Sequence, residues 1–571
     1  MHSNHFSKDQ PSWIRDIAFL AVVIFLFYMC WLGSYPLFTP DEGRYSEVAR
    51  EMVATGDYIT PRVNGVVFLD KPVLYYWLQA TAIHLFGVTE WSLRFFPAML
   101  AVLGCLITYV TGRNLFCRKT GLLAAVILAT TPLFFGGAHY ADLNIEVAVF
   151  ISATLFCIIN ALQSEGQRQR RFFLAAYVLA ACAFLTKGLI GIAFPGIITL
   201  LWIAILNRWD VLKKASLGTG LIIFLVLVLP WYVLAQIANP DFLHFFFVDQ
   251  QLSRFLSAQD FNNPTPIWFY APIILVGFFP WTIFLVQALG KSIGQVISDK
   301  KEHAATLFFL LWFIVVFVFF SIPHSKTVGY IFPVFPALAV LVGRYLALRY
   351  EEPSHRAIYW AVGNFVVLSG LLGIALISLP QLHLINNVTP TLYPYLYTFA
   401  FIFIAAAILS FYCIKRKTLL PFILLCVLCS AAFLLTLTKS AGHLNQNSAK
   451  PLTEYLQPIL HNDDEVAAYF KFYQDVPIYL QRKITLVADW QAPDIATRDN
   501  WVREMWYGMA FQKKNDQLIN EEQFWQRWNS DKRIFVFVSE NYFDQFRSHT
   551  KHYFVLDRYK DIILLSNKPV I

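Results

Sequence analysis

Long apolar stretches separated by short polar gaps dominate the first 440 residues of this 571-residue chain. About thirteen of them approach or reach the length of roughly 17 to 25 residues that an α-helix needs to cross a bilayer. They lie near residues 17–33, 93–111, 121–138, 145–162, 172–186, 189–206, 217–236, 266–289, 305–322, 330–349, 357–379, 396–414 and 418–438. The pattern predicts a polytopic α-helical membrane protein.

The remaining chain, residues 441–571, has a different pattern. Strand-like runs at 466–470, 484–487 and 534–538 alternate with helix-like ones such as 451–460. A segment of this length can bury a small α/β core. We therefore predict two domains, a transmembrane domain over residues 1–440 and an α/β domain over residues 441–571.

Basic residues are concentrated in every second gap between the apolar stretches. Six alternate gaps carry three each: Arg113, Arg118 and Lys119; Arg168, Arg170 and Arg171; Arg208, Lys213 and Lys214; Lys291, Lys300 and Lys301; Arg344, Arg349 and Arg356; Lys415, Arg416 and Lys417. Lys and Arg in short loops stay on the cytoplasmic side. We therefore expect a cytoplasmic N-terminus and, because thirteen spans is an odd number, a C-terminal domain on the outer side.

Composition supports a membrane protein: 57% of the residues are hydrophobic, and mean hydropathy is +0.52. The net charge of +8 is spread over the alternate loops rather than gathered on one face, so no nucleic-acid partner is expected. The eight cysteines fall in or beside apolar stretches, which indicates neither a disulfide framework nor a zinc motif.

Two long gaps are predicted to lie outside, at residues 34–92 and 237–265. The first contains the aromatic run 74–78, which suits a helix lying at the membrane interface.

Ionisable residues collect at the predicted outer ends of the apolar stretches. Asp41 and Glu42 follow the first stretch, Asp142 lies between the third and fourth, and the cations are Lys71, Lys187, Arg254 and Lys326. Each has a plainer interpretation: helix capping, snorkelling or contact with lipid headgroups. Cations kept outside against the usual bias, beside carboxylates, indicate a site for an anionic ligand.

Several strings in this chain match a known family. Residues 40–47 (PDEGRYSE), 56–58 (GDY) and 69–77 (LDKPVLYYW) closely resemble the first outer loop of lipid-carrier-dependent glycosyltransferases, within the protein O-mannosyltransferase superfamily. Further matches are LTKG at 185–188, Arg254-Phe255, and Ser325-Lys326 followed by Tyr330-Ile331. The relatives that the chain most resembles are the aminoarabinose transferases that modify lipid A.

This resemblance implies a GT-C fold with thirteen transmembrane helices and a periplasmic α/β domain in the bacterial inner membrane. It implies an inverting transfer of a sugar from a polyprenyl (undecaprenyl) phosphate carrier to lipid A or another envelope acceptor, with membrane lipids around the protein. Asp41 matches the essential acidic residue, Asp142 the second acidic residue, and Lys187 a supporting lysine. Lys71, Arg254 and Tyr330 match the residues that hold the carrier phosphate.

One departure concerns metal binding. Where close relatives read His-Glu-His-x-x-Arg-Phe, this chain has DQQLSRF at residues 249–255, so a zinc site is not expected there. Asp70 and Asp249 are instead candidate ligands for a harder divalent cation, because carboxylate oxygens suit Mg²⁺ or Ca²⁺.

Three alternatives remain open at the level of the sequence. The sugar could be mannose or another hexose, passed to a protein, a lipid or a glycan. A transporter or flippase would place charged residues near the bilayer midplane, whereas here they crowd the outer ends. If the chain were only a structural partner in an assembly, Asp41, Lys71 and Arg254 would have no function.

Overall fold

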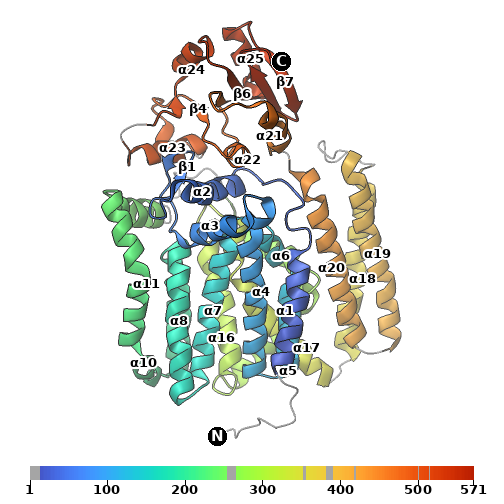
Figure 1. Ribbon diagram of the computed structural model, residues 1–571. Helices are drawn as coiled ribbons and strands as arrows, with labels where there is room; N and C mark the ends of the chain where they lie inside the picture. The colour runs from blue at the N-terminus through green and yellow to red at the C-terminus, as the bar shows by residue number, and fades with distance from the viewer. Residues whose placement is uncertain are drawn as a thin grey trace. The chain divides into compact units, whose positions relative to one another are not determined.

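The computed structural model describes residues 13–253, 265–351, 355–380, 390–416, 419–445, 447–498, 500–512 and 515–570 (Figure 1). The contacts divide the chain into two units. The first takes residues 1–32, 97–227 and 265–440, and the second takes residues 33–96, 228–264 and 441–571.

The first unit is built from helices, and each predicted apolar stretch coincides with one helix or a bent pair. They are α1 (Trp13–Met29), α5 (Arg118–Ala129), α6 (Pro132–Ala138), α7 (Asn144–Leu162), α8 (Gly166–Lys187), α9 (Ile190–Leu206), α10 (Asp210–Lys214), α14 (Tyr270–Gly277), α15 (Thr282–Ser298), α16 (Ala304–Ser321), η2 (Val328–Ile331), α17 (Val334–Glu351), α18 (His355–Ser378), η3 (Pro390–Leu392) and α19 (Tyr393–Arg416). Three more helices have residues in both units: α4 (Glu90–Leu115), α11 (Leu217–Ala238) and α20 (Leu419–Leu444).

The polytopic helical prediction is confirmed. Within the described ranges, seven helices are long and apolar enough to cross a membrane, or nine if each of two bent pairs forms one span. The count of thirteen spans stays a prediction.

Two of the apolar stretches are bent pairs of helices rather than single straight ones. The chain bends by 63° between α5 and α6, and by 113° between α14 and α15. A proline stands at each break, Pro132 at the start of α6 and Pro280 between α14 and α15. Proline lacks the backbone N–H and disfavours a helical conformation in the residue before it, which accounts for both interruptions.

The second unit joins the first outer loop to the C-terminal domain. The loop contributes α2 (Asp41–Thr55), the short strands β1 (Arg62–Val63) and β2 (Val66–Val67), and α3 (Leu74–Phe86). The segment after α11 adds α12 (Phe242–His244) and a π-helix, η1 (Phe245–Ser253). The run that begins at Leu74 is therefore a helix, as predicted.

The C-terminal domain is α/β, as predicted. Among its described residues, six strands form one sheet in the order β5-β4-β3-β6-β8-β7. They are β3 (Glu465–Tyr469), β4 (Thr485–Val487), β5 (Leu518–Ile519), β6 (Ile534–Ser539), β7 (Phe554–Tyr559) and β8 (Ile562–Ser566). β3, β4, β5 and β6 pair in parallel, whereas β8 pairs antiparallel with β6 and β7.

Helices complete this domain: α21 (Lys450–Leu456), η4 (Gln457–Ile459), α22 (Val476–Leu480), η5 (Ile495–Thr497), α23 (Trp501–Met509), α24 (Glu521–Trp528) and α25 (Glu540–His549). β3, β6 and β8 are buried along their whole length, which explains why each is apolar except for one terminal residue. Phe524 and Trp528 of α24 and Phe546 of α25 pack on the sheet residues.

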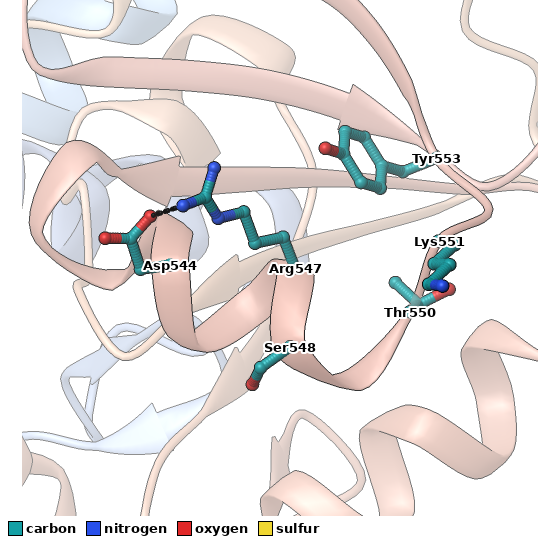
Figure 2. Close-up of a pocket in the computed structure, with 6 residues that line it drawn as sticks. All are labelled: Asp544, Arg547, Ser548, Thr550, Lys551 and Tyr553. Carbon is teal, nitrogen blue, oxygen red and sulfur yellow. Dashed lines mark ion pairs between the residues drawn. The ribbon is translucent and has the colours of Figure 1, made fainter.

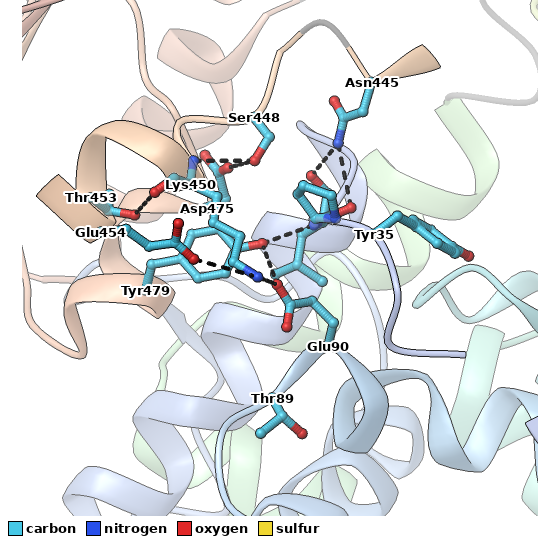
Figure 3. A network of polar contacts seen from close by, with 12 residues as sticks. Tyr35, Thr89, Glu90, Asn445, Ser448, Lys450, Thr453, Glu454, Asp475 and Tyr479 are labelled. Atoms are coloured by element: carbon cyan, nitrogen blue, oxygen red, sulfur yellow. Dashed lines mark hydrogen bonds and ion pairs between the residues drawn. The ribbon is translucent and has the colours of Figure 1, made fainter. Parts of the chain in front are cut away.

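Polar contacts tie the first outer loop to this domain within the second unit (Figure 3). Lys450 Nζ lies 2.6 Å from Glu90 Oε1, and the Tyr479 hydroxyl accepts a hydrogen bond from the Leu37 N–H at 2.9 Å. Asn445 Nδ2 donates to the Leu37 carbonyl at 2.8 Å. No local pattern signals these pairs, because their members lie more than 350 residues apart.

Candidate functional site

The ends of α7 and α8 hold one group of predicted site residues, in the first unit. α7 begins two residues after Asp142, and α8 ends at Lys187 with Gly188 as its cap, at a φ of 79°. Only three residues join the end of α7 to the start of α8, and the two helices pack together. The start of α7 and the end of α8 therefore lie together at the opposite end of the pair, away from the basic cluster at 168–171. Asp142 and Lys187, two of the predicted site residues, therefore lie at the same end of this helix pair.

Asn144 connects these two residues. Asp142 Oδ1 accepts the backbone N–H of Asn144 at 2.8 Å, and its Oδ2 accepts the Asn144 side-chain amide at 2.5 Å. Lys187 Nζ donates to Asn144 Oδ1 at 2.5 Å. The lysine charge therefore polarises the amide toward the carboxylate, which fixes both side chains. Sequence reasoning passed over Asn144, although its place two residues after Asp142 is a local turn signal.

Tyr330 completes this group, which we call the Asp142 group (Asp142, Asn144, Lys187 and Tyr330). Lys187 Nζ lies 4.2 Å from the centre of the Tyr330 ring, a cation–π geometry. The residue before it, Gly329, packs so closely that a Cβ there would come within 2.9 Å of the Asn144 side chain. The glycine is what lets η2 approach α7.

A further carboxyl stands in the first turn of α7. Glu146 is fully buried, and neither of its carboxyl oxygens has a hydrogen-bond partner among the described residues. A buried carboxyl without a partner is costly in its charged form. We assign Glu146 no step in the chemistry of the site.

Asp41 stands at the first position of α2, in the second unit. Its carboxylate lies 2.5 Å from Arg44 Nη2, one helical turn on, and the other arm of that guanidinium pairs with Glu504 of α23. Burial alone would lower the pKa of Arg44, but the Glu504 carboxylate raises it above its ordinary value. Arg44 is therefore a fixed positive charge between the two carboxylates. Sequence reasoning missed Glu504, which lies 460 residues away.

Glu42 has a different environment from its neighbour Asp41. Its carboxylate receives two hydrogen bonds from Arg94, each of 2.7 Å, and one from the Phe38 N–H at 2.7 Å. The side chains of Glu42 and Arg94 are 0% exposed, whereas that of Asp41 is 43% exposed. Asp41 is open to a ligand, and Glu42 is part of the core.

Lys71 and Asp70 lie just before α3. Lys71 Nζ donates to the backbone carbonyl of Asp70 at 3.1 Å. Both side chains are half-buried. Their neighbours in α3, Tyr75 and Tyr76, are fully buried and pack against Tyr45 of α2 with ring centres 5.9 and 6.3 Å apart.

Asp249 lies on η1, and its carboxylate is 3.8 Å from His244 Nδ1. Arg254 lies outside the described residues. The described ranges contain no group of three or more His, Cys, Asp or Glu side chains able to hold a metal ion. Asp70 and Asp249 thus belong to no such group in that part of the chain, and we assign no chemical step to a metal.

A polar hollow of about 490 Å³ on the C-terminal domain is lined by Asp544, Arg547, Ser548, Thr550, Lys551 and Tyr553 (Figure 2). Arg547 is paired with Asp544 at 3.0 Å, and both side chains are largely exposed. None of the predicted site residues belongs to this hollow.

Comparison with known proteins agrees with the fold. A family model described as dolichyl-phosphate-mannose-protein mannosyltransferase matches residues 70–233. The crystal structure of ArnT from Cupriavidus metallidurans bound to undecaprenyl phosphate superposes with a TM-score of 0.83, at 22% identity, over 98% of this chain and 99% of that one. The chain is thus a polytopic membrane protein of GT-C fold with a C-terminal α/β domain.

Two curated relatives carry the same name, undecaprenyl phosphate-alpha-4-amino-4-deoxy-L-arabinose arabinosyl transferase. The protein from Aeromonas salmonicida (strain A449) is 31% identical over 63% of this chain and 65% of its own length. That from Aeromonas hydrophila subsp. hydrophila is 32% identical over 59% and 61%. The matched region spans less than two thirds of these relatives. By sequence and by fold, the chain is similar to the proteins that the first-loop strings indicated, the lipid-carrier-dependent GT-C glycosyltransferases.

Proposed function

We propose that this chain is an inverting glycosyltransferase that takes its sugar from an undecaprenyl phosphate carrier. The leading reaction is transfer of 4-amino-4-deoxy-L-arabinose to lipid A. The observation that carries this proposal is the Asp142 group, in which a lysine is held between an amide and an aromatic ring beside a carboxylate. The names of the relatives support the choice of donor.

The leaving group requires cations. When the bond between the anomeric carbon and the phosphate oxygen breaks, the electron pair stays with the carrier phosphate. Fixed positive charge near that oxygen lowers the barrier. We assign this task to Lys71 and Arg254, with the Tyr330 hydroxyl as a further donor.

The carboxylates act on the sugar and the acceptor. The acceptor oxygen attacks the anomeric carbon from the face opposite the phosphate, which inverts its configuration. If the acceptor is a hydroxyl, its proton passes to the Asp41 carboxylate. If the acceptor is a phosphate of lipid A, it is already ionised, and Asp41 orients the acceptor or steadies the oxocarbenium-like sugar. Asp142, held by Asn144 and Lys187, is proposed as the second acidic residue.

We further propose the bacterial inner membrane as the location, with the N-terminus cytoplasmic and the C-terminal domain periplasmic. The alternation of basic loops supports this orientation. Membrane-impermeant labelling of single cysteines placed at Gly166 and Ser548 tests it. Labelling of the second position alone in intact spheroplasts is expected, and labelling of the first alone would reverse the orientation.

The test of the activity is reconstitution with undecaprenyl phosphate-aminoarabinose and lipid A. The expected product is lipid A heavier by one aminopentose, seen by mass spectrometry. Asp41→Asn should abolish the product. Asp57→Asn is the matched control in the same loop, because Asp57 accepts the N–H groups of Ile59 and Thr60 and asparagine preserves such a turn. Equal product from the two variants would refute the role of Asp41.

A second candidate donor is a polyprenyl-phosphate hexose, since the matching family model describes a mannosyltransferase. Offering both donors to the same preparation decides between them. Transfer of hexose without transfer of aminopentose would replace the leading reaction.

A further inference from the structure

A cavity of about 480 Å³ lies among α7, α8, α9, α10 and α11, in the first unit. Apart from two threonines and Tyr177, its lining is aliphatic or aromatic carbon. The Tyr177 hydroxyl donates a hydrogen bond to the Ala215 carbonyl at 3.1 Å, and the Tyr177 ring packs against Gly220 of α11. The cavity therefore offers almost nothing but an apolar wall.

This cavity opens toward the outside of the helices. Leu200, Leu217 and Leu221 belong to its lining and are 50, 53 and 56% exposed. On a helix that crosses a membrane, exposed leucines of this kind face lipid. A molecule in the cavity thus reaches it from the bilayer.

Cations border one end of the cavity. α10, which contributes Val211 and Leu212 to the lining, lies between α9 and α11. It carries Lys213 and Lys214, and Arg208 precedes it by two residues. Asp210 pairs with Arg208 at 3.0 Å and with Lys214 at 3.6 Å, so this one acid leaves the segment with an excess of positive charge. Figure 1 shows α10 at the foot of α11, beside the end of α8 where Arg170 and Arg171 are exposed.

The cavity is separate from the Asp142 group. Its lining on α8 runs from Phe173 to Ala180, whereas Lys187 ends that helix. At a rise of about 1.5 Å per residue, the distance along the helix is roughly 10 to 20 Å. The cavity lies toward the basic end of the helices, away from the candidate site.

We propose that this cavity binds an acyl chain of an anionic phospholipid, whose phosphate group is held by Arg208, Lys213 and Lys214. Apolar walls open to the bilayer suit a hydrocarbon chain. An excess of positive charge at one end, at the level where headgroups lie, suits a phosphate that carries net negative charge. A zwitterionic phospholipid would fill the cavity equally well but would gain less from the cations.

Substitution of a glycine that lines the cavity can fill it without disturbing the backbone. Gly196 lines it, and a Cβ placed there meets nothing within 4 Å. Gly196→Leu should therefore occupy the space of the acyl chain. Gly290→Leu on α15 is the matched control, since a Cβ there also meets nothing within 4 Å and the residue lies outside the cavity.

The charge is tested separately. The double substitution Lys213→Glu and Lys214→Glu reverses the charge at the basic end of the cavity. The control, Lys300→Glu with Lys301→Glu, makes the same change in another exposed basic loop that does not line the cavity. The assay is native mass spectrometry of the full chain, released from detergent with equal amounts of phosphatidylglycerol and phosphatidylcholine.

We expect one retained lipid per chain, with phosphatidylglycerol at least tenfold in excess over phosphatidylcholine. Gly196→Leu should lose the retained lipid, and the Lys213/Lys214 variant should retain lipid without the preference. Retention by Gly196→Leu at the level of its control, or equal retention of the two lipids by the unaltered chain, would overturn the proposal. Displacement of phosphatidylglycerol by an equal concentration of undecaprenyl phosphate would assign the cavity to the carrier instead and would also overturn it.

Discussion

Loss of charge at the adjacent acids Asp41 and Glu42 should have opposite effects: at Glu42 it should lower the stability of the fold, and at Asp41 it should abolish sugar transfer. Glu42 shares a fully buried ion pair with Arg94, made of two hydrogen bonds of 2.7 Å. Glu42→Gln leaves the guanidinium buried with its charge uncompensated. Breaking such a pair from one side costs about 3 to 5 kcal/mol.

Asp41→Asn provides the reference for the change in the free energy of unfolding. Its side chain is 43% exposed, and its partner Arg44 keeps a second carboxylate, Glu504. Solvent screens an ion pair of this kind, so Asp41→Asn should change the free energy of unfolding by no more than about 1 kcal/mol. The same substitution should abolish sugar transfer, because Asp41 is the acid that is open to a ligand.

The assay is thermal unfolding of both purified variants in one detergent, followed by the transfer reaction on the fraction that stays folded. Glu42→Gln should unfold at a clearly lower temperature while its folded fraction still transfers sugar. Arg94→Leu added to a Glu42→Leu background should recover part of the loss, because no buried charge then remains; recovery is incomplete, since Arg94 also binds the carbonyl groups of Tyr35 and Pro36. Equal unfolding temperatures for the Glu42→Gln and Asp41→Asn variants would refute the reasoning.

Three further predictions concern single contacts. Asn144→Ala removes the amide between Asp142 and Lys187. The loss of charge-assisted hydrogen bonds of about 1.5 to 3 kcal/mol should slow sugar transfer roughly 10- to 100-fold. An unchanged rate would show that the link through Asn144 does not support transfer. Gly329→Ala should slow transfer by displacing the Asn144 side chain, whereas Gly136→Ala, with open space around its Cβ, should not; the ratio of the two rates is the measurement. Burial raises the pKa of Asp475 from 3.8 to about 7 despite hydrogen bonds from Ser448 and Ala449. The folded state thus keeps a proton that the unfolded chain loses, so the free energy of unfolding should fall between about pH 4 and pH 7, by up to about 4 kcal/mol, and then level off. Asp475→Asn should flatten that slope in a pH series of denaturant titrations, and an equally steep slope would show that another group is responsible.

Much of the architecture was readable from local pattern. A bilayer demands long apolar helices, so each apolar stretch indicated a helix at nearly the right residues. The buried strands β3 and β6 were equally plain, because a strand covered on both faces is apolar along most of its length. β7 was missed because every one of its residues is exposed or half-exposed, which leaves no such signal. The two-residue strand β5 and the buried strand β8 were also not predicted. The two bends were missed because hydropathy does not register what one proline does to a backbone.

The sequence by itself determined the class of this protein and the residue types of its candidate site, since both depend on local composition and on short strings. Only the tertiary structure decided which of two adjacent acids is buried, that Asn144 links Asp142 to Lys187, and that Glu504 holds Arg44. These facts depend on contacts between segments far apart along the chain. Whether a side chain is buried and which groups it contacts depend on tertiary packing, so the residue type alone does not predict them.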